Sequence, residues 1–196
     1  AAIEKFNHGY PASMLVESGW RTLEIGAGLG EHAEHEDLTR QEYYFLEYRE
    51  DFCEAIRKRF ERARVFCADI HNRVPFTDGF FDRVLAVHVL EHLIHLPNAL
   101  NEILRILKPG GYLDIVIPCE GGVAHTLGRK VSAERLFRRE FKMDFTPIHK
   151  NEHVNSYIEI IEELRTRFKV TKSSFFPTKI PFYQINFCAG FRLKKR

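Results

Sequence analysis

Three glycines alternate with other residues in the stretch LEIGAGLG at positions 23–30. Gly26, Gly28 and Gly30 follow an apolar run, and a glycine-rich turn after a strand lets the backbone approach an anionic or nucleotide-like ligand. The spacing differs from the G-x-G-x-x-G of dinucleotide-binding loops, because Glu31 stands where the third glycine would be, and the Gly-Lys-Ser/Thr ending of a P-loop is absent. Acidic residues just downstream also disfavour a pyrophosphate.

Short apolar runs alternate with helical patterns around this loop, which is typical of a parallel sheet with helices on both faces. The expected strands span residues 21–25, 43–48, 65–69, 83–90 and 112–118, and the expected helices span 49–63 and 97–108. The PGG stretch at 109–111 is expected to end the second helix. The sequence therefore predicts an α/β fold.

The pattern changes after Pro118. Residues 119–130 have the composition of a loop, and 132–142 have the spacing of a basic amphipathic helix. Ser156 followed by Glu159 matches a capping box, which predicts a helix from there to about residue 168. The runs at 168–176 and 185–195 then predict two final strands, which should pair antiparallel because their connection is too short for a parallel crossover.

Composition narrows the class of protein. The 196 residues, 44% hydrophobic, suffice for one compact domain, and 29 basic against 27 acidic residues give no general indication of a nucleic-acid binder. No apolar run approaches the roughly 20 residues of a membrane span, and the start of the chain lacks a signal-peptide pattern. Four separated cysteines without a CxxC pair predict no metal site and no disulfide framework, in keeping with a cytoplasmic protein.

The combined motifs resemble the class I S-adenosylmethionine (SAM)-dependent methyltransferases, and among them the type 11 group. The resemblance covers residues 21–118 and rests on E-x-G-x-G-x-G at 24–30, on VPFTDGFFDRVLAVHVLEHL and on ILRILKPGGYLDIVIP. It implies a Rossmann-like, seven-stranded, mainly parallel sheet with an antiparallel last strand, helices on both faces and a lid insertion after strand 5. It also implies SAM as the cofactor and S-adenosylhomocysteine as its product.

The resemblance further implies which residues contact the cofactor. By this resemblance, the residues of the glycine loop lie along the methionine portion and the sugar of the cofactor. They are Glu24, Gly26, Ala27, Gly28 and Gly30. In the family the first acidic residue, here Glu24, lies near the ligand's amino group. Glu47 is expected to accept hydrogen bonds from both ribose hydroxyls, Asp69 to receive the adenine amino group, and Ile70 to lie beside the adenine.

Histidines are the candidates for acid–base chemistry. Methyl transfer from a sulfonium depends on positioning and desolvation, and a base is required only for a hydroxyl or protonated amine acceptor. His88 matches a family position that faces cofactor and acceptor, so it is a candidate for both catalysis and cofactor binding. His125, on the insertion, is the second catalytic candidate, and His149 and His153 are candidate substrate contacts. His92 is expected to have a structural role at a helix start.

We expect one methyltransferase domain over residues 1–196, with an N-terminal segment at 1–20 and a substrate lid at 119–150. Basic residues of the lid could recognise an anionic acceptor, with a solvated helix face as the alternative: Arg129, Lys130, Arg135, Arg138, Arg139 and Lys142. The aromatic tail from Phe175 to Tyr183 could wall a pocket, cover an interface or pack in the core.

The expected function is methyl transfer from SAM to an oxygen or nitrogen of a small-molecule or saccharide-type acceptor. The fourth strand carries VHVL at its end instead of the Asn-Pro-Pro-Tyr-like motif of base-amino methyltransferases, and no appended nucleic-acid domain is expected. Two alternatives stay open: an RNA- or other macromolecule-directed methyltransferase, and a non-catalytic cofactor-binding partner subunit. The loop spacing disfavours a nicotinamide oxidoreductase.

Overall fold

Seven strands form one sheet in the residues that this computed structural model describes, which are 2–61, 63–131 and 154–196. The strand order is β3-β2-β1-β4-β5-β7-β6, with β1 to β5 parallel and β7 antiparallel to both neighbours. This confirms the expected mainly parallel Rossmann-like sheet with an antiparallel last strand. The strands are β1 (Trp20–Ile25), β2 (Gln41–Glu47), β3 (Arg64–Cys67), β4 (Phe81–Val87), β5 (Leu107–Pro118), β6 (Phe168–Phe176) and β7 (Cys188–Lys195).

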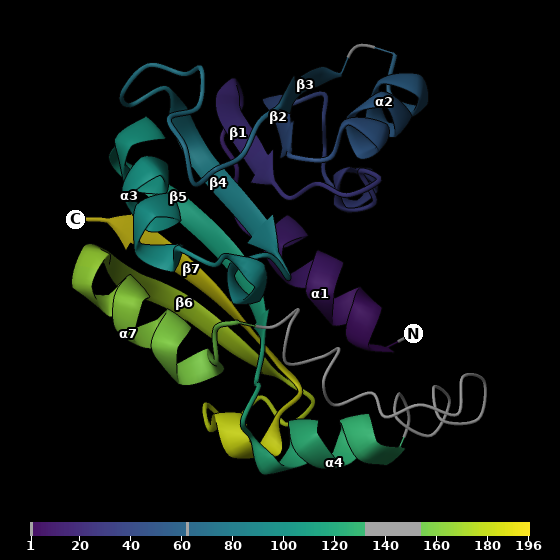
Figure 1. The fold of residues 1–196 in the computed structure, drawn as a ribbon, viewed down its shortest axis with the longest axis vertical. Helices are drawn as coiled ribbons and strands as arrows, with labels where there is room; N and C mark the ends of the chain where they lie inside the picture. The colour runs from purple at the N-terminus through teal and green to yellow at the C-terminus, as the bar shows by residue number, and fades with distance from the viewer. Residues whose placement is uncertain (1, 62, 132–153) are drawn as a thin grey trace.

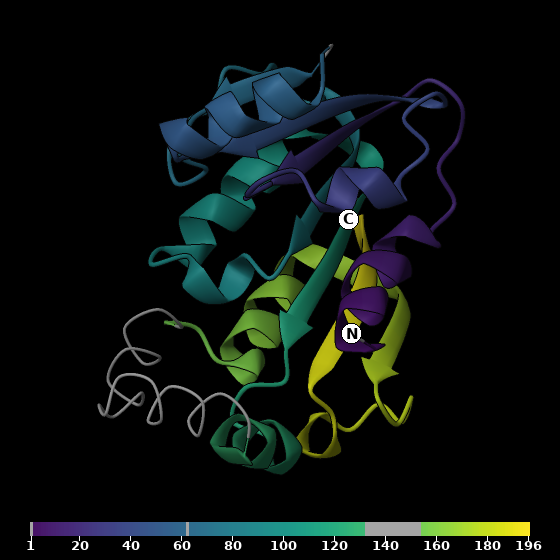
Figure 2. The same cartoon turned by 90° about the vertical axis from the view of Figure 1, so that its right-hand side faces the viewer.

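Helices cover both faces of the sheet, as Figures 1 and 2 show. One face packs against α3 (Leu96–Ile106) and α7 (Tyr157–Arg167), and the other against α1 (Ala2–Ala12) and α2 (Glu50–Arg59). The main apolar core lies under α3 and α7, where inward-facing strand residues such as Leu23 and Ile25 are buried. The remaining helices within the described ranges are α4 (Val123–Val131), η1 (His32–His35), η2 (Leu90–His92) and η3 (Tyr183–Ile185).

Of two helix boundaries predicted from nearby residues, one is confirmed and the other is not. The predicted capping box begins α7, because the Glu159 carboxylate accepts from the Ser156 amide at 2.7 Å and the Ser156 hydroxyl accepts from the Glu159 amide at 3.4 Å. By contrast, α3 ends at Ile106, and the PGG stretch belongs to β5 instead of ending the helix. Leu107 is already paired with Phe81 of β4. Pairing with the sheet therefore ends α3 before the two glycines of the PGG stretch are reached.

The prediction of a loop over residues 119–130 is wrong from Val123 onward, where α4 begins. The Val123 amide donates to the side-chain oxygen of Gln184 at 3.1 Å, and the Thr126 hydroxyl donates to the carbonyl of Gly122 at 2.9 Å. A helix start stabilised by a residue far along the chain has no local sequence signature. α4 lies in the segment predicted as a lid, at the lower end of the molecule in Figure 1.

The N-terminal segment forms α1, which packs across β5 and β7. The Tyr10 ring fills the space above Gly190, where an added Cβ would lie 2.3 Å from the ring. Phe6 packs on Phe176 with ring centroids 5.5 Å apart. Gly190 is therefore required for close approach of α1 to the sheet.

Charged side chains are buried between α1 and the sheet. Arg83 is fully buried and donates to Asp114 at 2.7 Å, to Glu36 at 2.9 Å and to the carbonyl of Pro11 at 2.8 Å. Asp114 also accepts two hydrogen bonds from Arg192, at 2.8 and 2.9 Å. Although burial opposes ionisation, hydrogen bonding from His32 and the charge of Arg83 lower the pKa of Glu36 to about 2. The network joins β4, β5 and β7 to the N-terminal segment.

Some of the predicted features lie outside the described residues, and the predicted aromatic tail is divided between the core and the surface. The basic helix at 132–142, His149 and His153 lie outside the described residues. Of the aromatic tail, Phe175 is buried in the core, Tyr183 stacks on Tyr157 at 4.8 Å, and Phe182 is half exposed. None of the helices in the described ranges is long and apolar enough to cross a membrane.

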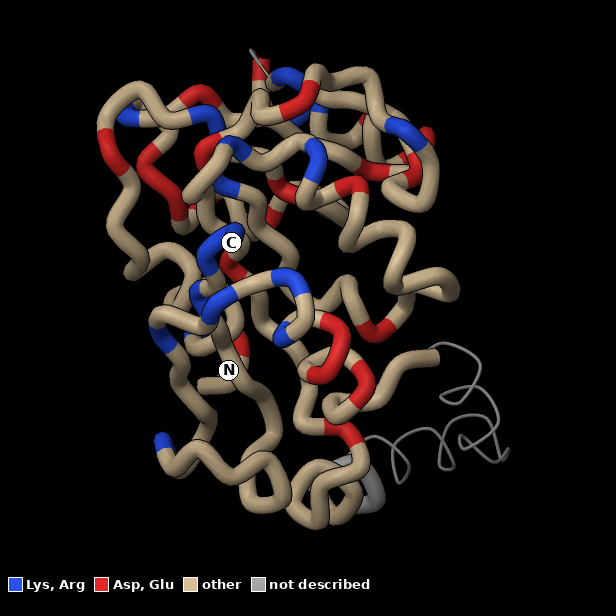
Figure 3. Tube along the Cα trace, turned by 90° about the vertical axis from the view of Figure 1, so that its left-hand side faces the viewer, with Lys and Arg blue, Asp and Glu red and all other residues tan. Residues whose placement is uncertain are grey.

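Charges of both signs lie side by side on one side of the molecule. In Figure 3 acidic positions gather along α7 and basic positions lie beside them on β6 and β7. Lys169 and Lys172 are exposed on β6, the strand at the edge of the sheet. Exposed lysines on an edge strand disfavour pairing with a further strand.

Candidate cofactor-binding site

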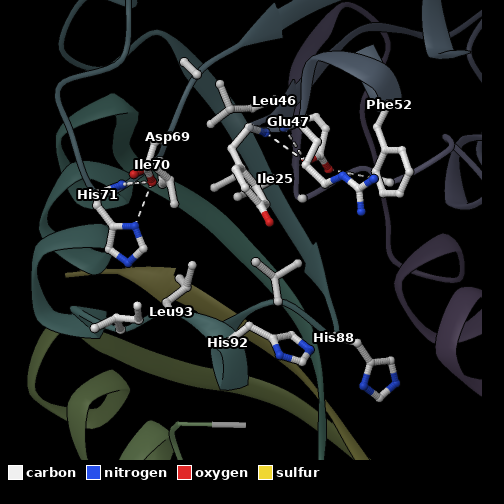
Figure 4. Close-up of a pocket in the computed structure, with 17 residues that line it drawn as sticks. Ile25, Leu46, Glu47, Phe52, Asp69, Ile70, His71, His88, His92 and Leu93 are labelled. Carbon is white, nitrogen blue, oxygen red and sulfur yellow. Dashed lines mark hydrogen bonds and ion pairs between the residues drawn. The ribbon is translucent and has the colours of Figure 1, made fainter. Parts of the chain in front are cut away.

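A cavity of about 640 Å³ opens where the carboxyl ends of β1 to β4 meet. Ligands bind at this edge in open α/β sheets, and small-molecule sites typically measure about 300–1,000 Å³. Figure 4 shows Glu47 and Asp69 on opposite sides of Ile25 and Leu46, with His88 and His92 along the lower edge. Most of the lining is apolar and comes from Ile25, Leu46, Phe52, Ala68, Ile70, Val89, Leu93 and Ile94.

The glycine loop forms one wall of the cavity. Gly26, Gly28 and Gly30 have φ angles of 62°, 55° and 76°, which favour glycine. A Cβ on Gly26 would lie 2.7 Å from Val89, and one on Gly30 would lie 2.8 Å from the Phe60 ring. At Gly28, which lines the cavity, the nearest atom to an added Cβ is 3.9 Å away. The space beside Gly28 is therefore open to a ligand, and a side chain there would compete for it.

Glu47, at the end of β2, is held by backbone amides. Its Oε2 accepts from the Gly28 amide at 2.9 Å, and its Oε1 accepts from the amides of Tyr48 at 2.9 Å and Arg49 at 3.0 Å. The residue is 4% exposed and lines the cavity. A carboxylate offers about four acceptor positions, so capacity remains for a ligand hydroxyl after these three bonds.

Asp69, just beyond β3, forms the opposite wall together with His71. Its Oδ1 accepts from the His71 amide at 2.9 Å and lies 2.7 Å from His71 Nδ1. Burial opposes ionisation, but these hydrogen bonds lower the pKa of Asp69 overall. His71 Nε2 accepts from the amide of His95 at 3.4 Å, which joins this wall to the start of α3. His71 also lines the cavity and was not predicted from the sequence, although an aspartate before a turn commonly bonds the residue two positions on.

His88 follows β4 directly and adopts a φ of 55°, which is uncommon for a residue with a side chain. Its amide donates to the carbonyl of Val116 at 2.9 Å, and its Nδ1 lies 3.1 Å from the Oε1 of Glu91, which is 1% exposed. A proton on Nδ1 completes this bond and leaves Nε2 as a hydrogen-bond acceptor. Nε2 lies 3.9 Å from the Cys188 sulfur, and burial raises the pKa of that thiol to about 12.

Glu91 was not predicted as a site residue, and the segment entering α7 helps to hold its loop. The backbone amides of Val154 and Asn155 donate to the Glu91 carbonyl at 2.9 and 3.1 Å. The Asn155 side chain donates to the carbonyls of Leu90 at 2.9 Å and Leu93 at 2.7 Å. Among the described residues the second carboxylate oxygen of Glu91 has no hydrogen-bond partner. His88 and Glu91 thus form a dyad whose position depends on a distant part of the chain.

Glu24 lies behind the glycine loop. It is 4% exposed, accepts from the Tyr43 hydroxyl at 3.0 Å, and is not among the residues that line the cavity. Burial raises the pKa of Glu24 to about 8, so the carboxyl is mainly protonated at neutral pH. Ala27 and Gly30 are likewise absent from the lining, and a cofactor contact by these three residues stays a prediction.

The structure brings some of the predicted histidines together and separates another. His88 and His92 line the cavity, whereas His125 lies on α4 and is not among the lining residues. The lining also includes Arg49 and Phe52, which sequence reasoning missed. The Arg49 guanidinium lies 3.9 Å from the centroid of the Phe52 ring and pairs with an exposed aspartate.

The residues of the cavity fit SAM. Apolar side chains from β1, β2 and the loop after β3 can cover an adenine ring, and carboxylates at Glu47 and Asp69 can accept hydrogen bonds from hydroxyl and amino groups. The open space beside Gly28 suits a ligand that passes close to the backbone.

Comparison with known proteins gives consistent matches. Residues 23–115 match the family model described as a methyltransferase domain, type 11. An uncharacterized protein of Methanocaldococcus jannaschii is 40% identical over 94 residues, covering 47% of this chain and 35% of that protein. A ubiquinone/menaquinone biosynthesis C-methyltransferase of Ralstonia nicotianae is 30% identical over 108 residues, covering 51% of this chain and 44% of that protein. The chain thus spans less than half the length of these curated relatives.

A solved structure from Thermotoga maritima, described as a SAM-dependent methyltransferase and possible histamine N-methyltransferase, is 25% identical with a TM-score of 0.66. The match covers 100% of this chain and 95% of that one. The strand order and the cavity therefore define a class I SAM-dependent methyltransferase, with SAM as its cofactor. Within that class, the match over residues 23–115 is to the type 11 methyltransferase domain.

Proposed function

We propose that this protein transfers a methyl group from SAM to an oxygen or nitrogen of a small molecule, with His88 as the general base. The observation that carries the proposal is the His88–Glu91 dyad at the cavity, with Nδ1 bonded to a buried carboxylate. When bound, SAM supplies an activated methyl group on a sulfonium. His88 Nε2 takes the proton that the acceptor loses as its oxygen or nitrogen acquires the methyl group.

Glu91 acts as a positioning residue in this proposal. Its carboxylate selects the tautomer that leaves Nε2 unprotonated, and it stabilises the imidazolium after proton transfer, as an acidic residue does behind other catalytic histidines. The apolar lining around the dyad excludes water from the reacting groups. The buried Cys188 thiol beside Nε2 stays protonated and leaves proton transfer to the imidazole.

The charge of the cavity supports a small acceptor over RNA. Among the described lining residues the only lysine or arginine is Arg49, which pairs with Asp51 at 2.5 Å. Nucleic-acid binding relies on several cations that contact phosphates. Recognition of an anionic acceptor would therefore fall to the basic residues of 129–142, whose side chains lie outside the described part of the chain.

An acidic carbon acceptor is the second candidate. The Ralstonia nicotianae relative is named a C-methyltransferase, and a sterol 24-C-methyltransferase of Schizosaccharomyces pombe is 29% identical over 120 residues. A base beside the cofactor serves a carbon acid as well as it serves a hydroxyl. Product analysis therefore has to assign the methylated atom as well as the substrate.

The test is transfer of labelled methyl from SAM by the full chain to fractionated small metabolites and, separately, to RNA. His88→Ala should lower the turnover number by about 10²- to 10⁴-fold, the usual contribution of a general base, while S-adenosylhomocysteine binding changes little. His125→Ala is the matched control and should retain activity, because His125 does not line the cavity. Label in RNA alone, or full activity of His88→Ala, would refute the proposal. The position of the label in the product, found by mass spectrometry, separates oxygen, nitrogen and carbon acceptors.

A further inference from the structure

Three potential metal ligands meet behind the cavity, away from the His88–Glu91 dyad. Glu50, Cys53 and Cys67 each offer one ligand atom, and these atoms all lie within 4.8 Å of one another. The spacing of the cysteines in the sequence does not predict this group, because Cys53 and Cys67 belong to different elements and neither is part of a CxxC pair. The structure thus brings three potential ligands together in a chain whose cysteine spacing predicts no metal site.

Regular secondary structure brings the three side chains together. Glu50 is the first residue of α2 and Cys53 lies three positions later, so both face the same side of the helix. Cys67 ends β3, where it pairs with Glu47 of β2. The short connection from β2 to α2 places the start of the helix beside the end of β3. A helix and a strand hold ligands with less freedom than a flexible loop does.

The surroundings suit a bound cation. Cys53 is fully buried and its thiol donates to the Glu47 carbonyl at 3.4 Å, while the Cys67 thiol donates to the Tyr48 carbonyl at 3.8 Å; metal–sulfur bonds would replace both hydrogen bonds. Both cysteines are free thiols, and Cys67 is exposed, which gives an ion and one water access to the group. Arg57 donates to Oε1 of Glu50 at 3.0 Å, which fixes the carboxylate in position.

The type of ligand selects the type of metal. Two thiolates and one carboxylate favour a borderline-soft ion such as Zn²⁺ over Mg²⁺ or Ca²⁺, which prefer oxygen ligands. Tetrahedral zinc with bonds of about 2.3 Å to sulfur requires ligand atoms about 3.8 Å apart, which the spacing of this group permits. The positive end of α2 and the charge of Arg57 offset part of the negative charge of the ligands.

We propose that Glu50, Cys53 and Cys67 bind one zinc-class divalent ion, with water as the fourth ligand. Binding releases the thiol protons and forms two metal–sulfur bonds without any change of oxidation state. The site adjoins the cavity through Glu47, Tyr48 and Arg49, but it takes no part in methyl transfer and does not depend on the proposed acceptor chemistry.

Cobalt(II) is the probe, because thiolate coordination gives it intense sulfur-to-metal charge-transfer absorption and tetrahedral d–d bands. The full chain, kept under a non-thiol reductant without oxygen, should bind one Co²⁺ with both features, and Zn²⁺ should displace it. Cys67→Ser should weaken binding at least about 100-fold, more than loss of a partner outside the coordination shell typically costs. Cys67 is exposed, so this variant should fold, as circular dichroism would verify.

Cys119→Ser is the matched control, because it removes a free thiol outside the group and should leave the cobalt spectrum unchanged. Three results would overturn the inference: no cobalt spectrum from the reduced chain, a spectrum that survives Cys67→Ser, or a Cys53–Cys67 disulfide whose reduction restores no metal binding. The readout is independent of methyl transfer, so a failed methylation assay would leave it intact.

Discussion

The amide of Gly28 donates a 2.9 Å hydrogen bond to Oε2 of Glu47, joining the glycine loop after β1 to the end of β2. The open space at Gly28 and the carboxylate of Glu47 therefore lie side by side at the cavity. Because the glycine loop and the strand-end acid are coupled, changes at either residue should alter ligand binding together.

Substitution of Gly28 or Glu47 should weaken cofactor binding. Gly28→Val adds a side chain to open cavity space at a φ of 55°, so it should nearly abolish S-adenosylhomocysteine binding. Glu47→Ala should cost about 1.5–3 kcal/mol, the range for hydrogen bonds to a charged group, or roughly 10- to 100-fold in affinity. Titration calorimetry measures both, and Glu54→Ala, on the exposed face of α2, is the control. Wild-type affinity in both variants would remove these residues from the site.

Glu91→Gln should reduce turnover without changing cofactor affinity. The amide still accepts a hydrogen bond from His88 Nδ1, but it lacks the charge that stabilises the imidazolium. The loss in the turnover number should be smaller than the roughly 10²- to 10⁴-fold expected on removing the base. Steady-state kinetics against pH, together with calorimetry on S-adenosylhomocysteine, test this. A purely structural role of Glu91 would instead lower the cofactor affinity and the melting temperature along with the rate.

Glu24 should make the protein less stable as pH rises. Burial raises the folded-state pKa of Glu24 to about 8 from an ordinary value of 4.5, so the unfolded chain releases this proton first. The stabilising contribution is complete below pH 4.5 and declines as pH rises through about 8. Glu24→Gln removes this decline and should be stabilised relative to wild type by a few kcal/mol at pH 9. Urea denaturation at pH 5 and pH 9 gives the difference in free energy of unfolding between Glu24→Gln and wild type at each pH. The same difference at both pH values would contradict the assigned ionisation of Glu24.

Breaking the buried charge network should strongly destabilise the fold. Asp114→Asn leaves the guanidinium groups of Arg83 and Arg192 with one buried carboxylate, that of Glu36, and loss of one partner of a buried ion pair typically costs about 3–5 kcal/mol. Asp78→Asn is the control, because this carboxylate is exposed and solvent screens its ion pair with Arg105. Chemical denaturation of both variants gives the comparison. Similar losses in the two would show that burial of Asp114 carries no special energetic weight.

Much of the fold could be predicted because its signals are local. The strand at Phe168–Phe176 and the capping box at Ser156 and Glu159 follow from residues that are close in sequence. α4 could not be predicted in this way, since Gln184 completes the hydrogen bonding at its start. The site shows the same limit: Glu47 and Asp69 follow from strand ends in a known pattern, whereas His71 enters the cavity through a turn that closes on Asp69.

The sequence by itself determined the class of fold and the glycine loop, because apolar periodicity and turn residues lie within short stretches, and its resemblance to a known family implied the cofactor. The tertiary structure alone decided which side chains share a site. It set Glu91 behind His88, Tyr43 against the buried carboxyl of Glu24, and Cys53 beside Cys67. These contacts depend on strand register, on the direction of each side chain and on how helices pack against the sheet, and no local pattern fixes all three.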